Sequence, residues 1–508
     1  MFKSAFKRIV CFIFCILLVV CSFPINAFAE QESVELTLET YLSSSKEPRM
    51  VQNYEALASR LDEQLKNFEP SINIYDFKLK STPENQQIIV DILSGGLPEC
   101  FHIDLAFQIS TYGEYIGAIV PNYLYTQDEY NQMLAECEAA ADKMLQGVEG
   151  NNNLSDVEKL LILHDRIAVS CEYDEERLEA GMVPQISHSM YGAFVNKLAV
   201  CQGYALAYEY MLNRIGIENY YVGSELLYHA WNIVYVDGKP YHVDITWDDN
   251  PWDITGKVTH KNFLVSTEKF IANGHYASDG DQYIIDYDTS PDDTTYDNYF
   301  WQDIESAFVQ LDDEIYYIDS INKAAQNQRV VIKRYSDNEI IYETEELWMV
   351  GNAYYPGNFA RLSSCGSELL FSLSDGIYSF NPKNSKVKLV QAKPNVGVGF
   401  NIYGFTYSDG MLIYDLSNSP FFNSETKKLY EYKVPYVPKE DLPYTPGDIN
   451  DDGDVTLTDV VFIAQYVAEW DVVCNELAVD VNGDESVNLQ DVTHLAQYVA
   501  DWEGVELH

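Results

Sequence analysis

Basic residues are few in this chain of 508 amino acids. Lys and Arg together number 32, whereas Asp and Glu number 79, so the formal net charge is −47. Proteins that bind nucleic acids contact the phosphates through a basic face. We therefore expect no nucleic-acid partner. An excess of carboxylates on this scale is instead typical of soluble proteins that bind cations.

Long apolar runs are missing after the N-terminus. No segment beyond residue 29 approaches the roughly 20 apolar residues of a membrane helix, so we expect no membrane span. The preceding residues hold a basic start, an apolar stretch over 9–20 and small residues before Glu30. This order is typical of a cleavable secretory signal, and Pro24 disfavours the alternative of an uncleaved anchor. We predict a signal peptide over 1–29 and a secreted chain that is extracellular or attached to the cell surface.

Cysteines with the spacing of a metal site or a disulfide framework are absent as well. Three of the nine cysteines lie in the predicted signal, and the other six contain no CxxC pair. The six are Cys100, Cys137, Cys171, Cys201, Cys365 and Cys474. An isolated thiol in an exported protein is either a buried, inert side chain or a catalytic nucleophile.

The first third of the chain mixes helical and strand-like patterns. Residue spacing predicts helices over 51–68 and 126–145 and strands over 87–93 and 115–120. Ser155 and Glu158 form a capping-box pattern that predicts the start of another helix. We expect an α+β fold for this part of the chain.

Short strands separated by Asp-Gly, Ser-Asp and Asn-Pro turns follow over 301–436. Three segments in this region are alike, at 311–318, 366–373 and 409–416. Their spacing is irregular, and three units are fewer than a closed propeller needs. The pattern predicts an all-β, blade-like (propeller-like) domain.

Near the C-terminus, oxygen-bearing side chains occur with the spacing of a calcium loop. Loop positions 1, 3, 5, 9 and 12 are Asp448, Asn450, Asp452, Thr456 and Asp459, with Gly453 at position 6 and Asp454 at position 7. The pattern recurs 32 residues later as Asp480, Asn482, Asp484, Asn488 and Asp491, with Ser486 at position 7. Calcium takes 6 to 8 oxygen ligands, and position 7 normally offers a backbone carbonyl. We predict two calcium ions.

Each loop runs into a helix, and the two helices are near copies. Nine of fourteen aligned positions are identical between residues 457–470 and 489–502. Over 447–502 the chain resembles the dockerin family of cellulosome-type assemblies, type I. The resemblance implies calcium-dependent folding and docking onto a cohesin domain of a scaffoldin. It also implies that Leu457, Thr458, Leu489 and Gln490 make the contact.

The second calcium loop departs from the pattern at one position. Glu485 stands where the loop favours a glycine in a left-handed turn. A residue with a side chain costs on the order of 1–2 kcal/mol in that conformation. We expect the second loop to bind calcium more weakly than the first.

A candidate nucleophile begins an apolar helix in the middle of the chain. Cys201 is followed by the small residues Gly203 and Ala205, which keep the first helical turn uncrowded. The N-terminus of a helix supplies positive potential, which favours ionisation of a thiol placed there. This placement makes Cys201 a candidate for nucleophilic catalysis.

A hairpin that follows offers a base and a carboxylate. The Asp237-Gly238 turn pairs Val236 with Lys239, and counting outward places Trp231 opposite Asp244 and His229 opposite Thr246. His229 and Asp244 then share one face, close enough to interact. A helix with Cys201 against that face would complete a Cys-His-Asp triad. His242 is the rival base, although packing is its simpler role.

Four motifs occur in this order: Tyr191-Gly-Ala-Phe194, Val200-Cys-Gln-Gly-Tyr-Ala205, His229-Ala-Trp-Asn232 and His242-Val-Asp-Ile-Thr-Trp-Asp248. Over about 155–270 the chain thus resembles the transglutaminase-like (papain-like) superfamily. The resemblance implies a triad of Cys201, His229 and Asp244. Lys197 stands where a glycine is common, a difference that we expect in a surface turn.

The sequence leaves the reaction open. Attack by the thiolate on a carbonyl gives a thioester, which water resolves in a peptidase or amidase and a lysine amine resolves in a cross-linking transglutaminase. Extracellular members of the superfamily more often look like hydrolases, so we favour a peptidase or amidase acting on extracellular protein or peptide. The alternative from another class is a scaffold-tethered protein that binds glycan or cell wall and carries a vestigial triad.

The predicted fold class is therefore multidomain. It combines an α+β transglutaminase/papain-like core, an all-β blade-like domain and a small all-α dockerin with two calcium loop-helix repeats. The predicted boundaries are 1–29 for the signal peptide, 30–150 for an N-terminal α+β region, 151–295 for the catalytic domain, 296–436 for the all-β domain, 437–446 for a linker and 447–508 for the dockerin.

Overall fold

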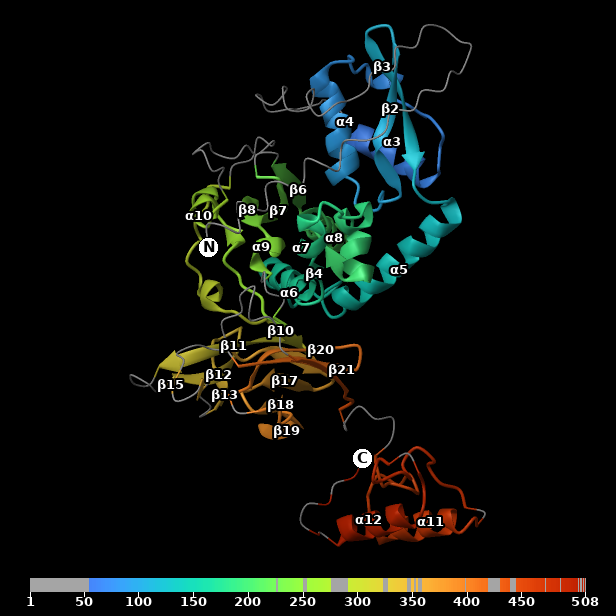
Figure 1. Ribbon diagram of the computed structural model, residues 1–508, viewed down its shortest axis with the longest axis vertical. Helices are drawn as coiled ribbons and strands as arrows, with labels where there is room; N and C mark the ends of the chain where they lie inside the picture. The colour runs from blue at the N-terminus through green and yellow to red at the C-terminus, as the bar shows by residue number, and fades with distance from the viewer. Residues whose placement is uncertain are drawn as a thin grey trace.

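The structure is a computed structural model (Figure 1). It describes residues 54–224, 227–249, 254–275, 291–322, 328–344, 349–350, 353–354, 359–397, 399–418, 430–438, 445–470, 472–484, 486–500, 502, 505 and 507. The predicted signal peptide, most of the predicted linker and Glu485 lie outside these residues. Within the described part of the chain, no helix has both the length and the apolar character needed to cross a bilayer.

The first described region packs two helices against a small sheet. Its helices are α3 (Tyr54–Lys66) and α4 (Pro83–Gly95), with a 3-10 turn η2 (Tyr75–Phe77). The strands β1 (Ile72–Asn73), β2 (Ile103–Tyr112) and β3 (Tyr115–Tyr123) form an antiparallel sheet in the order β1-β3-β2. The strand predicted at 115–120 is confirmed as part of β3.

The strand predicted over 87–93 is wrong, because these residues lie inside α4. The Thr82 side chain caps this helix by accepting a hydrogen bond from the Asn85 N–H, and Pro83 occupies its first turn. Ile88, Ile89 and Ile92 are buried at helical spacing. The caps and the 3.6-residue period outweigh the β-propensity of the isoleucines.

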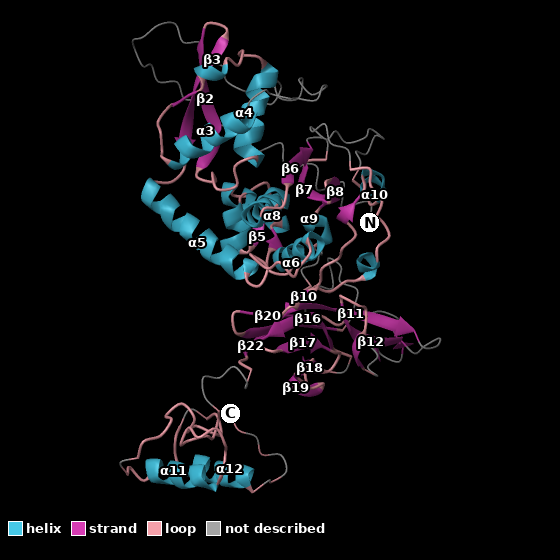
Figure 2. Ribbon diagram, turned by 180° about the vertical axis from the view of Figure 1, so that it is seen from behind, coloured by secondary structure: helices cyan, strands magenta, loops and turns pink. Residues whose placement is uncertain are grey.

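The next region surrounds a central helix, α8 (Cys201–Ile215). The helices α5 (Gln127–Leu145) and α6 (Asp156–Ala168) share its hydrophobic cluster, and Figures 1 and 2 both show them beside it. α6 begins with the predicted capping box of Ser155 and Glu158, and α5 begins with a second capping box, of Thr126 and Glu129. α5 belongs to this cluster although it lies before residue 150. The domain boundary predicted at residue 150 remains a prediction.

A four-stranded sheet in the order β6-β7-β8-β9 packs beside α8. Its strands are β6 (Asn219–Ser224), β7 (His229–Val236), β8 (Lys239–Val243) and β9 (Phe263–Val265). The short helices α9 (Ile245–Asp248) and α10 (Thr267–Ala272) follow β8 and β9. The remaining elements are β4 (Glu172–Tyr173), α7 (Glu175–Glu179), η3 (Gln185–His188), the π-helical turn η4 (Gly192–Asn196) and β5 (Leu198–Ala199).

The third region is antiparallel β-structure, as predicted. A 3-10 turn, η5 (Phe300–Asp303), leads into four sheets. Their strands are β10 (Val309–Leu311), β11 (Glu314–Asn322), β12 (Gln328–Arg334) and β13 (Ile340–Glu343); β14 (Met349–Val350) and β15 (Ala353–Tyr354); β16 (Leu362–Cys365), β17 (Glu368–Ser372), β18 (Gly376–Asn381) and β19 (Lys386–Ala392); and β20 (Asn401–Ser408), β21 (Met411–Ser417) and β22 (Tyr430–Pro435). Over the described strands these sheets form no closed barrel or ring, so the blade-like assignment remains a prediction.

The antiparallel β-structure from β10 to β22, here called the β-region, packs against the region from α5 to α10 that surrounds α8. The backbone N–H of Thr255 donates to Asp415 on β21 at 2.8 Å, and a Cβ added to Gly256 would lie 1.9 Å from the carbonyl oxygen of Phe405. Gly256 also has a φ of +70°, which favours glycine. The two regions therefore meet in a fixed interface rather than through a loose linker.

The C-terminal region has two helices, α11 (Leu457–Val467) and α12 (Leu489–Val499). Both have capping boxes, formed by Thr456 with Asp459 and by Asn488 with Asp491. Ile463 and Leu495 lie at equivalent positions of the two helices and are buried in one small core. The predicted loop-helix repeat is therefore present as a pair of packed helices.

Candidate active site and calcium loops

Cys201 is the first residue of α8, as the sequence predicts. A Cβ added to Gly203 would lie 2.9 Å from the carbonyl oxygens of Ser187 and Ser189. Only glycine allows this close approach between the first turn of α8 and the segment around η3. This close packing buries the start of α8, and 4% of the surface of Cys201 is exposed.

His229 and Asp244 meet beside this thiol. The Nε2 of His229 donates to Oδ2 of Asp244 at 2.7 Å, and His229 also hydrogen-bonds with the Cys201 side chain. Because Asp244 occupies Nε2, the other ring nitrogen is the one left for the thiol. The structure thus brings the three predicted residues together.

The backbone reaches this arrangement differently from the expected hairpin. Val236 pairs with Lys239 as predicted, but β8 ends at Val243, and Asp244 is the N-cap of α9. The predicted pairing of His229 with Thr246 is wrong, because Thr246 lies in α9. The Asp244 carboxylate accepts the Trp247 N–H at 3.2 Å, which is a side-chain cap. Capping turns the carboxylate out of the strand and toward the imidazole.

The charges of this pair stabilise each other. Burial by itself would lower the pKa of His229, but the carboxylate of Asp244 and the hydrogen bond with Cys201 raise it to about 10. Burial opposes the charge of Asp244, yet the charge and hydrogen bond of His229 hold its pKa below the ordinary range. The imidazole is therefore protonated at neutral pH, which suits a thiolate-imidazolium pair.

His242, the rival base, has other partners. The Trp231 indole donates its Nε1–H to Nδ1 of His242 at 3.0 Å, and Nε2 of His242 lies 3.2 Å from the Thr267 hydroxyl. Burial, followed by the neighbouring His275, lowers the pKa of His242 to about 3. The structure therefore gives His242 the packing and hydrogen-bonding role and leaves His229 beside the thiol.

His275 was not predicted from the sequence. Its Nε2 lies 2.7 Å from the same Oδ2 of Asp244 that His229 contacts, and its side chain is completely buried. His275 follows α10, 31 residues beyond Asp244, and no motif surrounds it. Only the packing of α10 against β8 brings it to the site.

Four other thiols are less suited to ionise than a free cysteine. Burial raises the pKa values of Cys100, Cys137, Cys171 and Cys474. Cys201, in contrast, has an imidazole partner in His229.

The first calcium loop is organised around its own carboxylates. The N–H groups of Asp452 and Gly453 donate to the two oxygens of Asp448 at 3.0 and 2.9 Å. At the far end, the buried Asp459 accepts the N–H groups of Ile449 and Thr456 at 2.8 Å. These bonds draw loop positions 1 and 12 together around a set of oxygen donors, which fits calcium.

The second loop repeats this arrangement. The N–H groups of Gly483 and Asp484 donate to Asp480 at 3.0 and 3.2 Å, and those of Asn482 and Asn488 donate to Asp491. The donor set of carboxylate, amide and hydroxyl oxygens fits calcium as well. Glu485, where we predict weaker calcium binding, lies outside the described residues.

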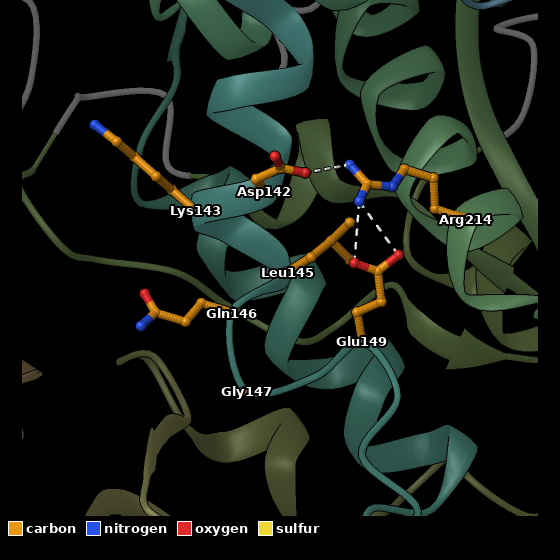
Figure 3. A pocket seen from close by; sticks show the side chains of 7 residues that line it. All are labelled: Asp142, Lys143, Leu145, Gln146, Gly147, Glu149 and Arg214. Carbon is orange, nitrogen blue, oxygen red and sulfur yellow. Dashed lines mark hydrogen bonds and ion pairs between the residues drawn. The ribbon is translucent and has the colours of Figure 1, made fainter.

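A surface hollow of about 610 Å³ lies away from both sites (Figure 3). The end of α5 and Arg214 of α8 form it, and Arg214 donates to Asp142 at 2.7 Å and to Glu149 at 3.0 Å. Its two cations, Arg214 and Lys143, are paired with carboxylates, and its lining contains no thiol, hydroxyl or imidazole. We assign it no catalytic role.

Comparison with known proteins identifies the C-terminal region. No curated protein matches the chain. A solved structure described as a TGase is 16% identical with a TM-score of 0.21, over 34% of this chain and 50% of that chain. A structure described as a cysteine protease from Cytophaga hutchinsonii is 14% identical with a TM-score of 0.16, over 28% of this chain and 62% of that chain. The chain thus spans half to three-fifths of these two proteins.

The family model described as Dockerin type I domain matches residues 446–500, which confirms the predicted dockerin. Domains of this type generally bind calcium and pair with a cohesin. The chain therefore carries a type I dockerin domain at residues 446–500.

Proposed function

We propose that this protein is a secreted, cellulosome-associated thiol enzyme of the transglutaminase-like kind, with Cys201, His229 and Asp244 as its triad. The observation that carries the proposal is the 2.7 Å hydrogen bond between His229 and Asp244 beside the Cys201 thiol. The domain boundaries predicted above, including the signal peptide over 1–29, belong to this proposal.

In this reaction the Cys201 thiolate attacks an amide carbonyl carbon. His229 then gives its proton to the leaving amine as the carbon–nitrogen bond breaks, which leaves a thioester. Asp244 holds the imidazole in the tautomer and orientation that this transfer needs. Water next attacks the thioester, loses a proton to His229, and releases an acid and the free thiol.

We favour hydrolysis of extracellular protein or peptide over cross-linking. A primary amine in place of water would give a new amide by the same steps, so cross-linking is the second outcome of the test below. Binding of glycan or cell wall with an inactive triad is the third outcome.

The dockerin attaches this enzyme to the cohesin of a scaffoldin. The two loops, from Asp448 to Asp459 and from Asp480 to Asp491, each hold one calcium ion in this proposal. Calcium neutralises the carboxylates that converge in each loop and thereby stabilises the fold of the docking surface.

Substitution of the nucleophile tests the enzyme. Casein is incubated with the full-length protein, and free amino groups and the incorporation of a fluorescent primary amine are measured in parallel. Cys201→Ala is expected to lower turnover by about a thousandfold or more. Cys365→Ala, which removes a buried thiol in the β-region, is the matched control and is expected to keep wild-type turnover.

The two readouts separate the three outcomes. Release of amino groups that depends on Cys201 supports hydrolysis, and incorporation of the amine supports cross-linking. Equal rates for the wild type and Cys201→Ala in both assays would refute the proposal of a thiol enzyme. The protein that binds glycan or cell wall would then be the remaining hypothesis.

A further inference from the structure

One carboxylate oxygen of Asp244 contacts two histidines. The Nε2 atoms of His229 and His275 both lie 2.7 Å from its Oδ2. We propose that His275 is a positioning residue of the thiol site, which holds the Asp244 carboxylate in the orientation that directs His229 toward Cys201. This inference rests on the proposed function and adds a fourth residue to it.

His275 is held in place by aromatic packing. Its ring stacks on Phe270 with 3.5 Å between ring centroids, and the centroid of the Trp247 ring lies 3.8 Å away. The preceding Gly274 has a φ of +115°, and a Cβ there would come within 3.3 Å of the Trp247 ring. The stack on Phe270 therefore fixes His275 through a contact that does not involve Asp244.

The other contacts of the carboxylate hold it less firmly. Within the described part of the chain, Oδ1 accepts the 3.2 Å bond from the Trp247 N–H, and Oδ2 accepts from His229. His229 is itself the group to be oriented and must release its proton during turnover. His275 also donates to Oδ2 but takes no part in the reaction, so its hydrogen bond can hold the carboxylate in place while His229 exchanges its proton.

The charges assign the proton on His275. The ring faces two acceptors, Oδ2 of Asp244 and the Phe270 carbonyl oxygen at 3.2 Å from Nδ1. Burial and the charge of His229 lower the pKa of His275, so the ring carries one proton. That proton lies on Nε2, because a hydrogen bond to a carboxylate is stronger than one to a carbonyl.

The charged groups that act on His275 belong to the same site. In the described part of the chain, the titratable side chains that act on it are Asp244 and His229, and it acts in turn on His242. The uncharged rings of Phe270 and Trp247 pack against it. A neutral His275 therefore serves as a hydrogen-bond donor, and the site keeps a single imidazolium at His229.

Alkylation of Cys201 tests this inference without a substrate. The full-length protein is treated with iodoacetamide between pH 4 and pH 9, and the rate at Cys201 is measured by mass spectrometry of its peptide. His275→Phe keeps the aromatic stack but removes the donor. His275→Gln places an amide N–H near the former Nε2–H. His242→Asn is the matched control, because it alters a buried histidine whose ring nitrogens face Trp231 and Thr267.

We expect His275→Phe to slow alkylation at pH 6 by about tenfold or more, as follows from losing one hydrogen bond to a charged group. The acid limb of its rate profile should move to higher pH, because a less firmly directed imidazolium stabilises the thiolate less. His275→Gln should restore the rate to within about threefold of the wild type, and His242→Asn should leave the acid limb in place.

Three results would count against us in distinguishable ways. If wild-type Cys201 reacts no faster than the other cysteines, the proposed function fails. If it reacts fast and His275→Phe matches it in rate and acid limb, only the inference about His275 fails. If His275→Phe and His275→Gln are impaired equally, the donor is irrelevant and the positioning role is overturned.

Discussion

A buried histidine outside the thiol site should make the stability of this protein depend on pH. His164 on α6 is completely buried, with Nδ1 at 2.7 Å from Asp165 and Nε2 at 3.3 Å from Asp248. Burial alone would lower its pKa, but the hydrogen bond to Asp165 and the nearby carboxylate of Asp248 raise the pKa to about 9 from an ordinary 6.5. Both ring nitrogens face carboxylates and the pKa lies above 7, so the ring is an imidazolium at neutral pH.

The same carboxylates connect α6 to the next region of the chain. The Phe308 N–H donates to Asp165 at 2.6 Å, and His260 lies 2.9 Å from Asp165 with its other ring nitrogen 3.1 Å from the Ile304 carbonyl oxygen. Loss of the charge on His164 would leave buried carboxylates at the junction with the β-region without their cation.

The direction and size of the effect follow from the difference in pKa. The folded protein holds a proton on His164 that the unfolded chain releases above pH 6.5. The stabilisation is thus complete below pH 6.5, decreases between pH 6.5 and 9, and is lost above pH 9. A difference of about 2.5 pH units corresponds to about 3 kcal/mol of unfolding free energy.

Urea unfolding at pH 6 and pH 9.5 measures this contribution. Exposure of the buried Cys171, detected by a saturating alkylation pulse, reports unfolding of the region around α6. The stability lost between the two pH values should be about 3 kcal/mol smaller in His164→Gln than in the wild type. His242→Asn is the matched control, because burial and His275 keep that ring neutral over this range. A wild type equally stable at both pH values would refute the reasoning, whether or not His164→Gln folds.

Three further predictions concern the site, the calcium loops and the interface. Asp244→Asn should slow alkylation of the triad cysteine by iodoacetamide at pH 7 by about tenfold to a hundredfold, because the amide no longer offers a charged acceptor to two imidazoles; an unchanged rate would contradict the role of the carboxylate. Calorimetric titration of the calcium-free protein should give two ions per chain, one after Asp448→Ala and none when Asp480→Ala is added; full occupancy in the double variant would exclude these loops. Gly256→Ala should destabilise the protein by more than about 2 kcal/mol in thermal unfolding, because the new Cβ meets the Phe405 carbonyl at a positive φ; an unchanged melting temperature would disprove the close contact.

Local patterns determined much of what the sequence predicted correctly. The capping boxes at Thr126 and Ser155 depend on side chains three residues apart, so the start of each helix could be read without tertiary information. The Asp237-Gly238 turn set the register of β7 and β8 for the same reason. The calcium loops and their repeat are equally local.

Burial against distant parts of the chain cannot be read from local patterns. The β-propensity of the isoleucines in residues 87–93 predicts a strand, yet these residues lie in α4, because burial of the isoleucines at helical spacing and the cap at Thr82 outweigh that propensity. The arrangement of the β-region into sheets has the same dependence.

The residue types and their order predict the components of the site: a thiol at a helix start, a histidine on one strand and an aspartate on the next. How these side chains meet depends on tertiary packing. The end of β8 at Val243 turns Asp244 into a helix cap, and the packing of α10 brings His275 to the same oxygen. The physical reason is that a hydrogen bond needs atoms within about 3 Å, and distances of that kind between segments dozens of residues apart are fixed by packing rather than by spacing along the chain.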